Sequence, residues 1–235
     1  MPTILITGAS RGLGLEFARA YAADGWKVIA TCRNPGSADD LKMLPGDIAI
    51  CALDIAQTDQ IKALAVELAA QPIDILINSA GMHGPRDTTG TFGNMDVAAW
   101  LEVVRVNAAA PLKVTEAFLP HVKAGTHKKI VFISSRAGSI AERGSLPHHK
   151  PGGPYAYRSS KATLNAVAKA LAFDLRPQGI SVVILHPGWV KTETGGWDAP
   201  TSPATSVADM RKVISQASPA DNGVFRNFDG TVIPW

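Results

Sequence analysis

The sequence has little cysteine: Cys32 and Cys51 are the only two among its 235 residues. Two cysteines exclude a disulfide framework, and no spacing of cysteine and histidine matches a structural metal site. The adjacent histidines His148 and His149 have no further candidate ligands nearby, so we expect no metal. The low cysteine content is typical of a protein from a reducing compartment.

The sequence also lacks an excess of one charge and lacks long apolar runs. Its 23 basic and 20 acidic residues leave a formal charge of +3, which is too small to indicate a nucleic-acid partner. Charged residues, proline or glycine interrupt every apolar stretch before it reaches membrane-spanning length. The chain begins Met1-Pro2-Thr3 and continues at once into an apolar run, without the pattern of a secretory leader. We therefore expect a cytoplasmic protein with no membrane partner.

Short β-branched runs alternate with longer segments of helical period, which predicts βαβ units around a parallel sheet. Each run is apolar on both faces, as buried parallel strands are. We expect residues 1–235 to form a single domain with a Rossmann-type, doubly wound α/β fold of about seven strands and helices on both faces. The strands are expected at residues 3–7, 27–31, 48–53, 73–78, 129–134 and 181–186, with an edge strand at 224–228.

Two long helices are expected, at residues 96–123 and 155–176. In the first, Pro111 removes a backbone donor and predicts a kink near Asn107. In the second, apolar residues recur at helical spacing from Leu164 to Leu175. We expect the apolar stripes of the two helices to form a four-helix interface in a homodimer. Other expected features are a loop at 144–154, a substrate loop at about 192–222 and a short helix at 207–214.

A glycine-rich turn, Thr7-Gly8-Ala9-Ser10-Arg11-Gly12-Leu13-Gly14, follows the first expected strand. Glycine adopts positive φ and has no Cβ, so backbone amides can approach a pyrophosphate at the positive end of the following helix. Three glycines by themselves could equally form an ordinary turn. The order of strand, glycines and helix is the one that dinucleotide binding requires, and it favours a dinucleotide site.

The end of the second strand selects the coenzyme in such folds, because an acidic residue there binds the ribose 2′-hydroxyl of NAD. This sequence has Arg33 there instead, 33 − 14 = 19 residues after Gly14, and Arg11 lies within the glycine turn. Two guanidinium groups can clamp a 2′-phosphate, so we expect NADPH rather than NADH, although both arginines could be solvated surface charges. Asp54, after the third strand, could bind the adenine amino group or cap a helix.

Tyr157 and Lys161 are four residues apart on the second long helix and project from one side of it. Ser135 follows the fifth strand, at the edge where open α/β sheets bind ligands. A carbonyl that receives hydride needs a proton donor, and Tyr157 can serve if the Lys161 ammonium lowers the pKa of the phenol. Ser135 would hold the substrate oxygen. Asn107 could hold a water that links Lys161 to solvent, or could simply satisfy the helix bend.

Taken in order, these motifs resemble the short-chain dehydrogenase/reductase family. The resemblance includes the glycine turn, Asn78-Ser79-Ala80-Gly81, the Tyr157 and Lys161 pair, and Pro187-Gly188 after the sixth strand. It implies a catalytic tetrad of Asn107, Ser135, Tyr157 and Lys161. It also implies a site for NADP(H) whose residues are Gly8, Ser10, Arg11, Gly12, Leu13, Gly14, Arg33, Asp54, Ile55, Asn78, Ala80, Gly81, Tyr157, Lys161, Pro187, Gly188, Val190 and Thr192.

Within the family, segments 155–161, 186–192 and 228–231 are similar to the sniffer and C-factor subgroup. Sniffer-type members are NADPH-dependent reductases of aldehydes, ketones and quinones, and the resemblance implies such a carbonyl reductase. C-factor is associated with intercellular signalling, so a nucleotide-binding signalling protein with incidental turnover is the alternative. Sugar-nucleotide epimerisation on the same fold is a weaker one.

The chain departs from the family pattern in two places. Ser79 replaces the second asparagine of the family's Asn-Asn-Ala-Gly, and the interval between Ser135 and Tyr157 is longer than usual because of the loop at 144–154. Trp189 and Trp197 could wall a pocket for flat carbonyl compounds or pack within a short lid.

Overall fold

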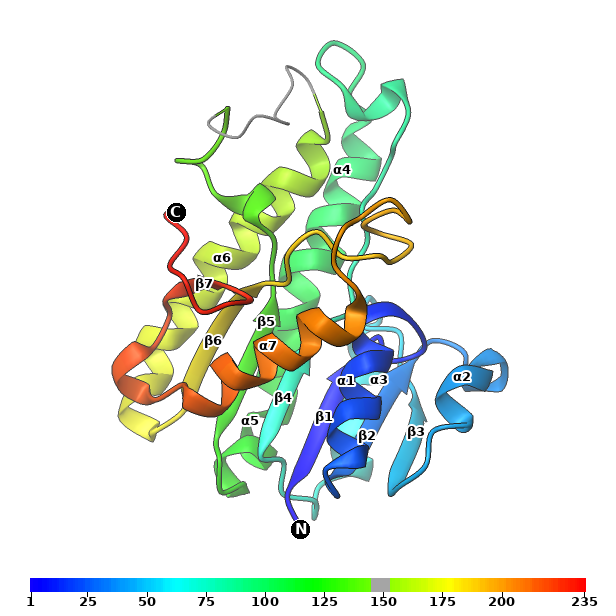
Figure 1. Ribbon diagram of the computed structural model, residues 1–235, viewed down its shortest axis with the longest axis vertical. Coiled ribbons are helices and arrows are strands. Elements are labelled where there is room, and N and C mark those ends of the chain that lie inside the picture. The colour runs from blue at the N-terminus through cyan, green and yellow to red at the C-terminus, as the bar shows by residue number, and fades with distance from the viewer. Residues whose placement is uncertain (145–152) are drawn as a thin grey trace.

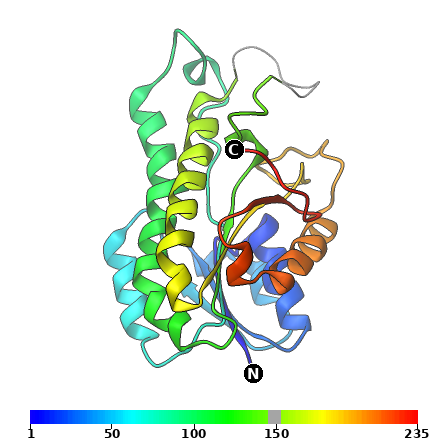
Figure 2. The same ribbon diagram turned by 90° about the vertical axis from the view of Figure 1, so that its left-hand side faces the viewer.

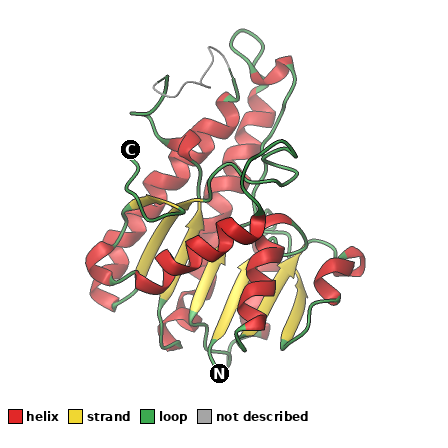
Figure 3. Cartoon of the chain, in the orientation of Figure 1, coloured by secondary structure: helices red, strands yellow, loops and turns green. Residues whose placement is uncertain are grey.

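The computed structural model describes residues 1–144 and 153–235, so most of the loop expected at 144–154 lies outside the described residues. Its strands form one sheet in which all neighbouring strands are parallel, in the order β3-β2-β1-β4-β5-β6-β7 (Figures 1 and 3). The doubly wound α/β fold predicted from the sequence is confirmed. The strands are β1 (Thr3–Thr7), β2 (Lys27–Cys32), β3 (Ile48–Ala52), β4 (Ile75–Asn78), β5 (Lys129–Ile133), β6 (Ser181–His186) and β7 (Phe225–Asn227).

Predicted and observed strand ends agree within two residues. The burial of one strand, β3, differs from the prediction. Most of β3 is half-buried and Ala52 is exposed, because β3 is an edge strand with only β2 beside it. The prediction that both of its faces are buried is therefore wrong. Cys32 on β2 is buried and Cys51 on β3 is half-buried.

Helices cover both faces of the sheet, as predicted (Figure 2). On one face, Phe17 of α1 and Ile214 of α7 belong to a core shared with Ile6 of β1. On the other face, Phe118 of α5 and Leu164 of α6 belong to a second core. Among the described residues, no helix has the length and apolar composition needed to cross a membrane. The helices are α1 (Gly12–Ala23), α2 (Asp39–Lys42), α3 (Thr58–Glu67), α4 (Val97–Val104), α5 (Ala110–Ala124), α6 (Tyr155–Leu175) and α7 (Pro203–Gln216).

The long helix expected at residues 96–123 is interrupted where the sequence predicts a kink. A π-helical turn at Arg105–Ala109 separates α4 from α5. Pro111 has no N–H to donate to the carbonyl of Asn107, so the regular bonding pattern cannot continue through this point. π-turns inside helices are frequent at functional sites. Asn107 lies in this turn and is buried.

The apolar stripe of α6 faces the core and is not available as a surface. Leu164, Ala168 and Leu175 are buried in the core. Leu164, Ala168 and Leu175 therefore cannot form the predicted dimer interface, whereas Val167 and Leu171 of the same stripe are half-buried. The outward side of α6 instead carries the exposed residues Ala166, Ala170 and Phe173.

The helix expected at residues 207–214 is longer at both ends, as α7 shows. The hydroxyl oxygen of Ser202 accepts a hydrogen bond from the N–H of Thr205, which caps the first turn. At the other end, the Lys129 ammonium donates to two carbonyl groups of the last turn. This lysine comes from β5, so only the tertiary structure provides the C-terminal cap.

Candidate active site

Strands β1 and β4 are neighbours in the sheet although they are not consecutive in the chain, so their connections leave in opposite directions. The carboxyl ends of strands at such a point are where open α/β sheets bind nucleotides. The register pairs Thr7 with Asn78, the last residues of the two strands. The glycine turn and the motif that begins at Asn78 therefore start side by side.

The glycine turn contains close contacts that a larger residue would prevent. Gly8 has φ +71°, and a Cβ there would lie 2.8 Å from the Cα of Ala80. Gly14 lies in the first turn of α1, where a Cβ would lie 2.2 Å from the carbonyl oxygen of Gly8. The hydroxyl oxygen of Thr7 accepts hydrogen bonds from the N–H groups of Ser79 and Ala80 at 3.1 and 3.2 Å. The turn thus leads directly into the N-terminal end of α1, which favours an anion.

The other residues of this turn differ in how their side chains are placed. Gly12 has φ +57° and begins α1. Ser10 is partly buried, and Leu13 is partly buried against the core. The side chain of Leu13 therefore contributes to packing, and its backbone is the part available to a coenzyme.

Arg11 and Arg33 are exposed at the same edge of the sheet, because β2 ends next to β1. Arg11 forms an ion pair of 2.5 Å with Glu193, and both side chains are about two-thirds exposed. An ion pair this exposed contributes little to stability. A phosphate group can therefore compete with Glu193 for Arg11.

Asp54 follows β3, and the structure contradicts one of the two roles predicted for it. The carboxylate of Asp54 accepts a hydrogen bond from the N–H of Ala56 at 3.0 Å, whereas α3 is preceded by Gln57 as its N-cap residue. The helix-cap alternative is wrong. Ile55 is buried in the core, so its backbone is the part that can reach a coenzyme.

Tyr157, Lys161 and Ser135 are brought together where β5 ends. The hydroxyl group of Ser135 lies close enough to that of Tyr157 to lower the pKa of the phenol. The Lys161 ammonium lies 5.8 Å from the centroid of the Tyr157 ring and donates to the carbonyl of Ile133 at 2.9 Å. A phenol, a hydroxyl and an ammonium group therefore share one small volume at the carboxyl edge of the sheet.

The pKa values in this group differ from the expected pattern. Burial raises the pKa of Tyr157, and the Ser135 hydrogen bond and the Arg86 charge only partly offset that rise. Burial lowers the pKa of Lys161 to about 8. The net pKa of the phenol is therefore raised, and burial is the largest cause; the role of Lys161 in stabilising the phenolate stays a prediction. A raised pKa keeps the phenol protonated at neutral pH, which is the form an acid needs.

Asn107 holds the loop after β4. Its amide nitrogen donates to the carbonyl of Met82 and to the hydroxyl oxygen of Ser160, and its amide oxygen accepts from the N–H of Met82, all within 2.9 Å. A Cβ on Gly81 would lie 3.1 Å from the Asn107 amide oxygen and 3.8 Å from the Lys161 ammonium. Asn107 thus lies beside the Tyr157 and Lys161 pair. Its hydrogen bonds hold the Met82 backbone and the Ser160 hydroxyl, and none of them goes to a backbone group of the helix bend.

The residues expected at the nicotinamide end follow β6. Pro187 accepts a hydrogen bond at its carbonyl from the α7 hydroxyl of Ser206. Gly188 has φ +83°, and Val190 is buried. Thr192 lies against the glycine turn, since a Cβ on Gly12 would be 3.5 Å from its methyl group. This segment therefore returns from β6 to the beginning of α1.

Two residues of this site were missed by sequence reasoning. The ring of His83 stacks on the ring of Tyr157, and Arg86 donates to the carbonyls of Glu193 and Thr194 at 3.2 and 2.7 Å. Both follow the motif that ends at Gly81 by only a few positions. That proximity is the one feature of the sequence that could have indicated them.

Trp189 and Trp197 are 59% and 76% exposed, so neither forms a buried wall. The indole N–H of Trp189 donates to the carbonyl of Gly195, within its own segment. This contact supports the alternative of packing within a short lid.

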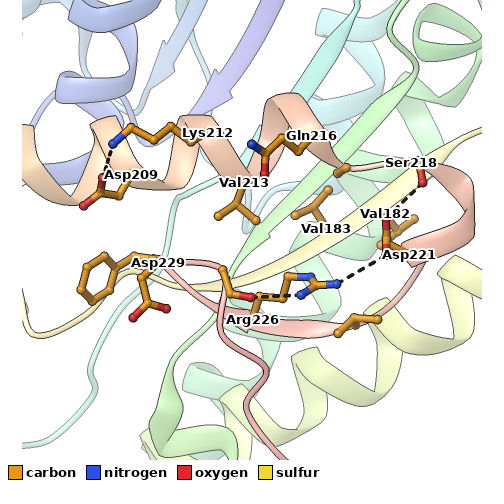
Figure 4. A pocket seen from close by; sticks show the side chains of 14 residues that line it. Val182, Val183, Asp209, Lys212, Val213, Gln216, Ser218, Asp221, Arg226 and Asp229 are labelled. Carbon is orange, nitrogen blue, oxygen red and sulfur yellow. Dashed lines mark hydrogen bonds and ion pairs between the residues drawn. The ribbon is translucent and has the colours of Figure 1, made fainter.

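A separate cavity of about 480 Å³ lies between α7 and strands β6 and β7 (Figure 4). It contacts Val182 and Val183 near the start of β6, whereas the predicted site residues lie at the carboxyl ends of strands. Four of its charged side chains are paired, Lys212 with Asp209 and Arg226 with Asp221, and the carboxylate of Asp229 accepts hydrogen bonds from the N–H and the hydroxyl of Thr231. None of the predicted site residues lines this cavity, so it is distinct from the candidate active site.

Comparisons with known proteins agree with this arrangement. A family model described as short chain dehydrogenase matches residues 2–199. The chain is 39% identical over 174 residues to the C-signal protein of Myxococcus xanthus, covering 74% of this chain and 99% of that one. The fold is similar to an NADPH-bound carbonyl reductase from chicken fatty liver, with a TM-score of 0.90, 34% identity and coverage of 100% and 99%. It is also similar to the carbonyl reductase Sniffer of D. melanogaster, with a TM-score of 0.88, 33% identity and full coverage of both chains.

Proposed function

The chain belongs to the short-chain dehydrogenase family of oxidoreductases, and from this premise we propose that it is an NADPH-dependent reductase of aldehydes, ketones and quinones. The observation that carries the proposal is the meeting of Tyr157, Ser135 and Lys161 beside the glycine turn. The similarity to two carbonyl reductases supports it. When bound, the coenzyme would supply the hydride.

Residues of this chain would then bind and protonate the substrate oxygen. The hydroxyl groups of Ser135 and Tyr157 lie close together, so a carbonyl oxygen can accept from both, and Tyr157 donates its proton as negative charge develops there. The product is an alcohol, and Tyr157 is left as a phenolate. The Lys161 ammonium is close enough to stabilise that anion until a proton from water restores the phenol.

The residues around the glycine turn fit a dinucleotide phosphate. Positions 8 and 14 admit no Cβ, and the N-terminal end of α1 follows them directly. Arg11 and Arg33 would hold the 2′-phosphate, with Arg11 exchanging Glu193 for the phosphate. Asn78, Ala80 and Gly81 would line the adenosine side.

An Arg33→Ala substitution should weaken NADPH binding by about tenfold or more, because a charge-assisted contact with a phosphate is lost. NADH binding should change little, since NADH lacks that phosphate. Titration calorimetry with both coenzymes measures the difference. Arg19→Ala is the matched control, because Arg19 is an exposed arginine of α1 paired with Glu16. Equal losses for both coenzymes would contradict the assigned role of Arg33.

Turnover separates the reductase from a signalling protein that only binds the nucleotide. The purified protein is mixed with NADPH and a panel of quinones and aldehydes, and the absorbance of the reduced nicotinamide is followed. We expect the absorbance of the reduced nicotinamide to fall with several of these substrates. Tight NADPH binding without turnover on any of them would favour the signalling alternative, which the identity with the C-signal protein supports.

We also propose that residues 1–235 act as a single cytoplasmic domain that pairs through the outward side of α6. Exposed Phe173 borders an apolar groove shared with Ile140 and Trp235, and the small residues Ala166 and Ala170 allow two helices to approach closely. Light scattering should give the mass of a dimer, and Phe173→Glu should give that of a monomer. A monomeric wild-type protein would refute the pairing.

A further inference from the structure

Among the described residues, His83 makes the ring contact to the proposed proton donor. Its imidazole lies almost parallel to the Tyr157 phenol, with ring centroids 4.8 Å apart and an angle of 14° between the planes. The two residues come from different elements, His83 from the loop after β4 and Tyr157 from the first turns of α6. The imidazole therefore covers one face of the phenol.

The position of His83 is fixed mainly by its backbone. The preceding residue, Met82, is bonded through both its N–H and its carbonyl to the Asn107 amide. The following residue, Gly84, has φ +80°, and a Cβ there would lie 2.5 Å from a methyl group of Val103 on α4. The Nδ1 atom of His83 is buried and has no hydrogen-bond partner among the described residues. Stacking and backbone contacts therefore decide where this ring lies.

The surroundings favour the neutral form of the stacked imidazole. Burial lowers the pKa of His83, and the nearby Arg86 charge lowers it further. Among the described residues, the charged and titratable groups around the phenol are His83 and Arg86 from the loop after β4 and Lys161 from α6, while the end of β5 contributes the neutral hydroxyl of Ser135. A neutral ring covers one face of the phenol without supplying a charge that would favour the phenolate.

We propose that His83 is a positioning residue for the reaction: its ring, stacked on the Tyr157 ring, keeps the phenol hydroxyl directed at Ser135 and limits the access of water to the phenol. This role rests on the proposed function, because it matters only if Tyr157 is the acid. The Asn107 amide contributes to this role, because its hydrogen bonds hold the Met82 backbone and so position the neighbouring His83.

The test compares His83→Ala, which uncovers the phenol, with His83→Phe, which keeps an aromatic face in place. Ultraviolet titration of tyrosinate follows Tyr157 directly, because the chain has only three tyrosines and a Tyr157→Phe background subtracts the other two. In His83→Ala, water reaches the phenol and its pKa falls, so we expect about a tenfold larger acid dissociation constant. In His83→Phe we expect the wild-type value. This readout needs no turnover, so its failure is distinguishable from failure of the proposed function.

Kinetics provide a second readout. Reduction needs the protonated phenol, so kcat falls as pH rises through the pKa of Tyr157; this descending limb should lie at lower pH in His83→Ala and be unchanged in His83→Phe. At neutral pH the phenol is protonated in both proteins, and there we expect kcat to fall about tenfold in His83→Ala because the hydroxyl is less well oriented, with KM for NADPH unchanged. A His83→Ala protein that titrates like wild type, or a His83→Phe protein that titrates like His83→Ala, would overturn the proposal. If His83→Ala does not fold, His83→Gln removes the ring and takes its place in both measurements.

Discussion

A Tyr157→Phe variant is expected to lose carbonyl reduction by about 10²- to 10⁴-fold while binding NADPH as tightly as the wild type. The substitution removes one oxygen atom, the proton donor beside the Ser135 hydroxyl, and leaves a ring of the same shape against His83. The developing negative charge on the substrate oxygen then has no proton to accept from this side chain. Steady-state kinetics with a quinone and fluorescence titration with NADPH measure the two quantities.

Tyr155→Phe is the matched control for this experiment. Tyr155 lies two residues earlier on the same helix and is 40% exposed. Its loss should leave both turnover and coenzyme binding near the wild-type values. A Tyr157→Phe enzyme that keeps more than a tenth of the activity would remove Tyr157 from the proposed mechanism, and an equal loss in Tyr155→Phe would indicate a general effect on the helix.

A Gly14→Ala variant is expected to be destabilised by about 3 kcal/mol and to lose measurable coenzyme binding. Alanine is normally preferred to glycine inside a helix by up to about 1 kcal/mol. Here that preference is outweighed, because the new Cβ would lie 2.2 Å from the carbonyl oxygen of Gly8 and no flexible side chain can move to relieve the contact. For a chain of this length the melting temperature should fall by roughly 6–12 °C.

Gly36→Ala provides the comparison for Gly14→Ala. Gly36 is exposed, has no positive φ, and its Cβ would meet only the flexible side chain of Asn34 at 3.1 Å. Calorimetric unfolding should therefore give a melting temperature within about 2 °C of the wild type for this variant. If Gly14→Ala melts as late as Gly36→Ala and still binds NADPH, the close packing of the glycine turn is not needed for either property.

Features that depend on neighbouring residues could be predicted from the order of the amino acids alone. The β-branched runs predicted the strands within two residues at each end, because buried parallel strands are continuous apolar runs bounded by turn residues. Pro111 predicted the interruption near Asn107, because a missing N–H acts only four residues away. The glycine turn was predictable for the same reason, since positive φ and the missing Cβ are properties of the residues themselves.

Features that depend on the approach of distant segments became visible in the folded chain. Helical spacing predicted that Lys161 lies beside Tyr157. The direction in which the phenol pKa shifts depends on burial, which raises it, and on Ser135 after β5 and Arg86 after β4, which lower it. The apolar stripe of α6 was visible in the sequence, yet only packing showed that it faces the core. His83 became part of the site because the Asn107 amide holds the neighbouring backbone. Desolvation, stacking and charge interactions depend on distance in space, and separation along the chain does not determine that distance.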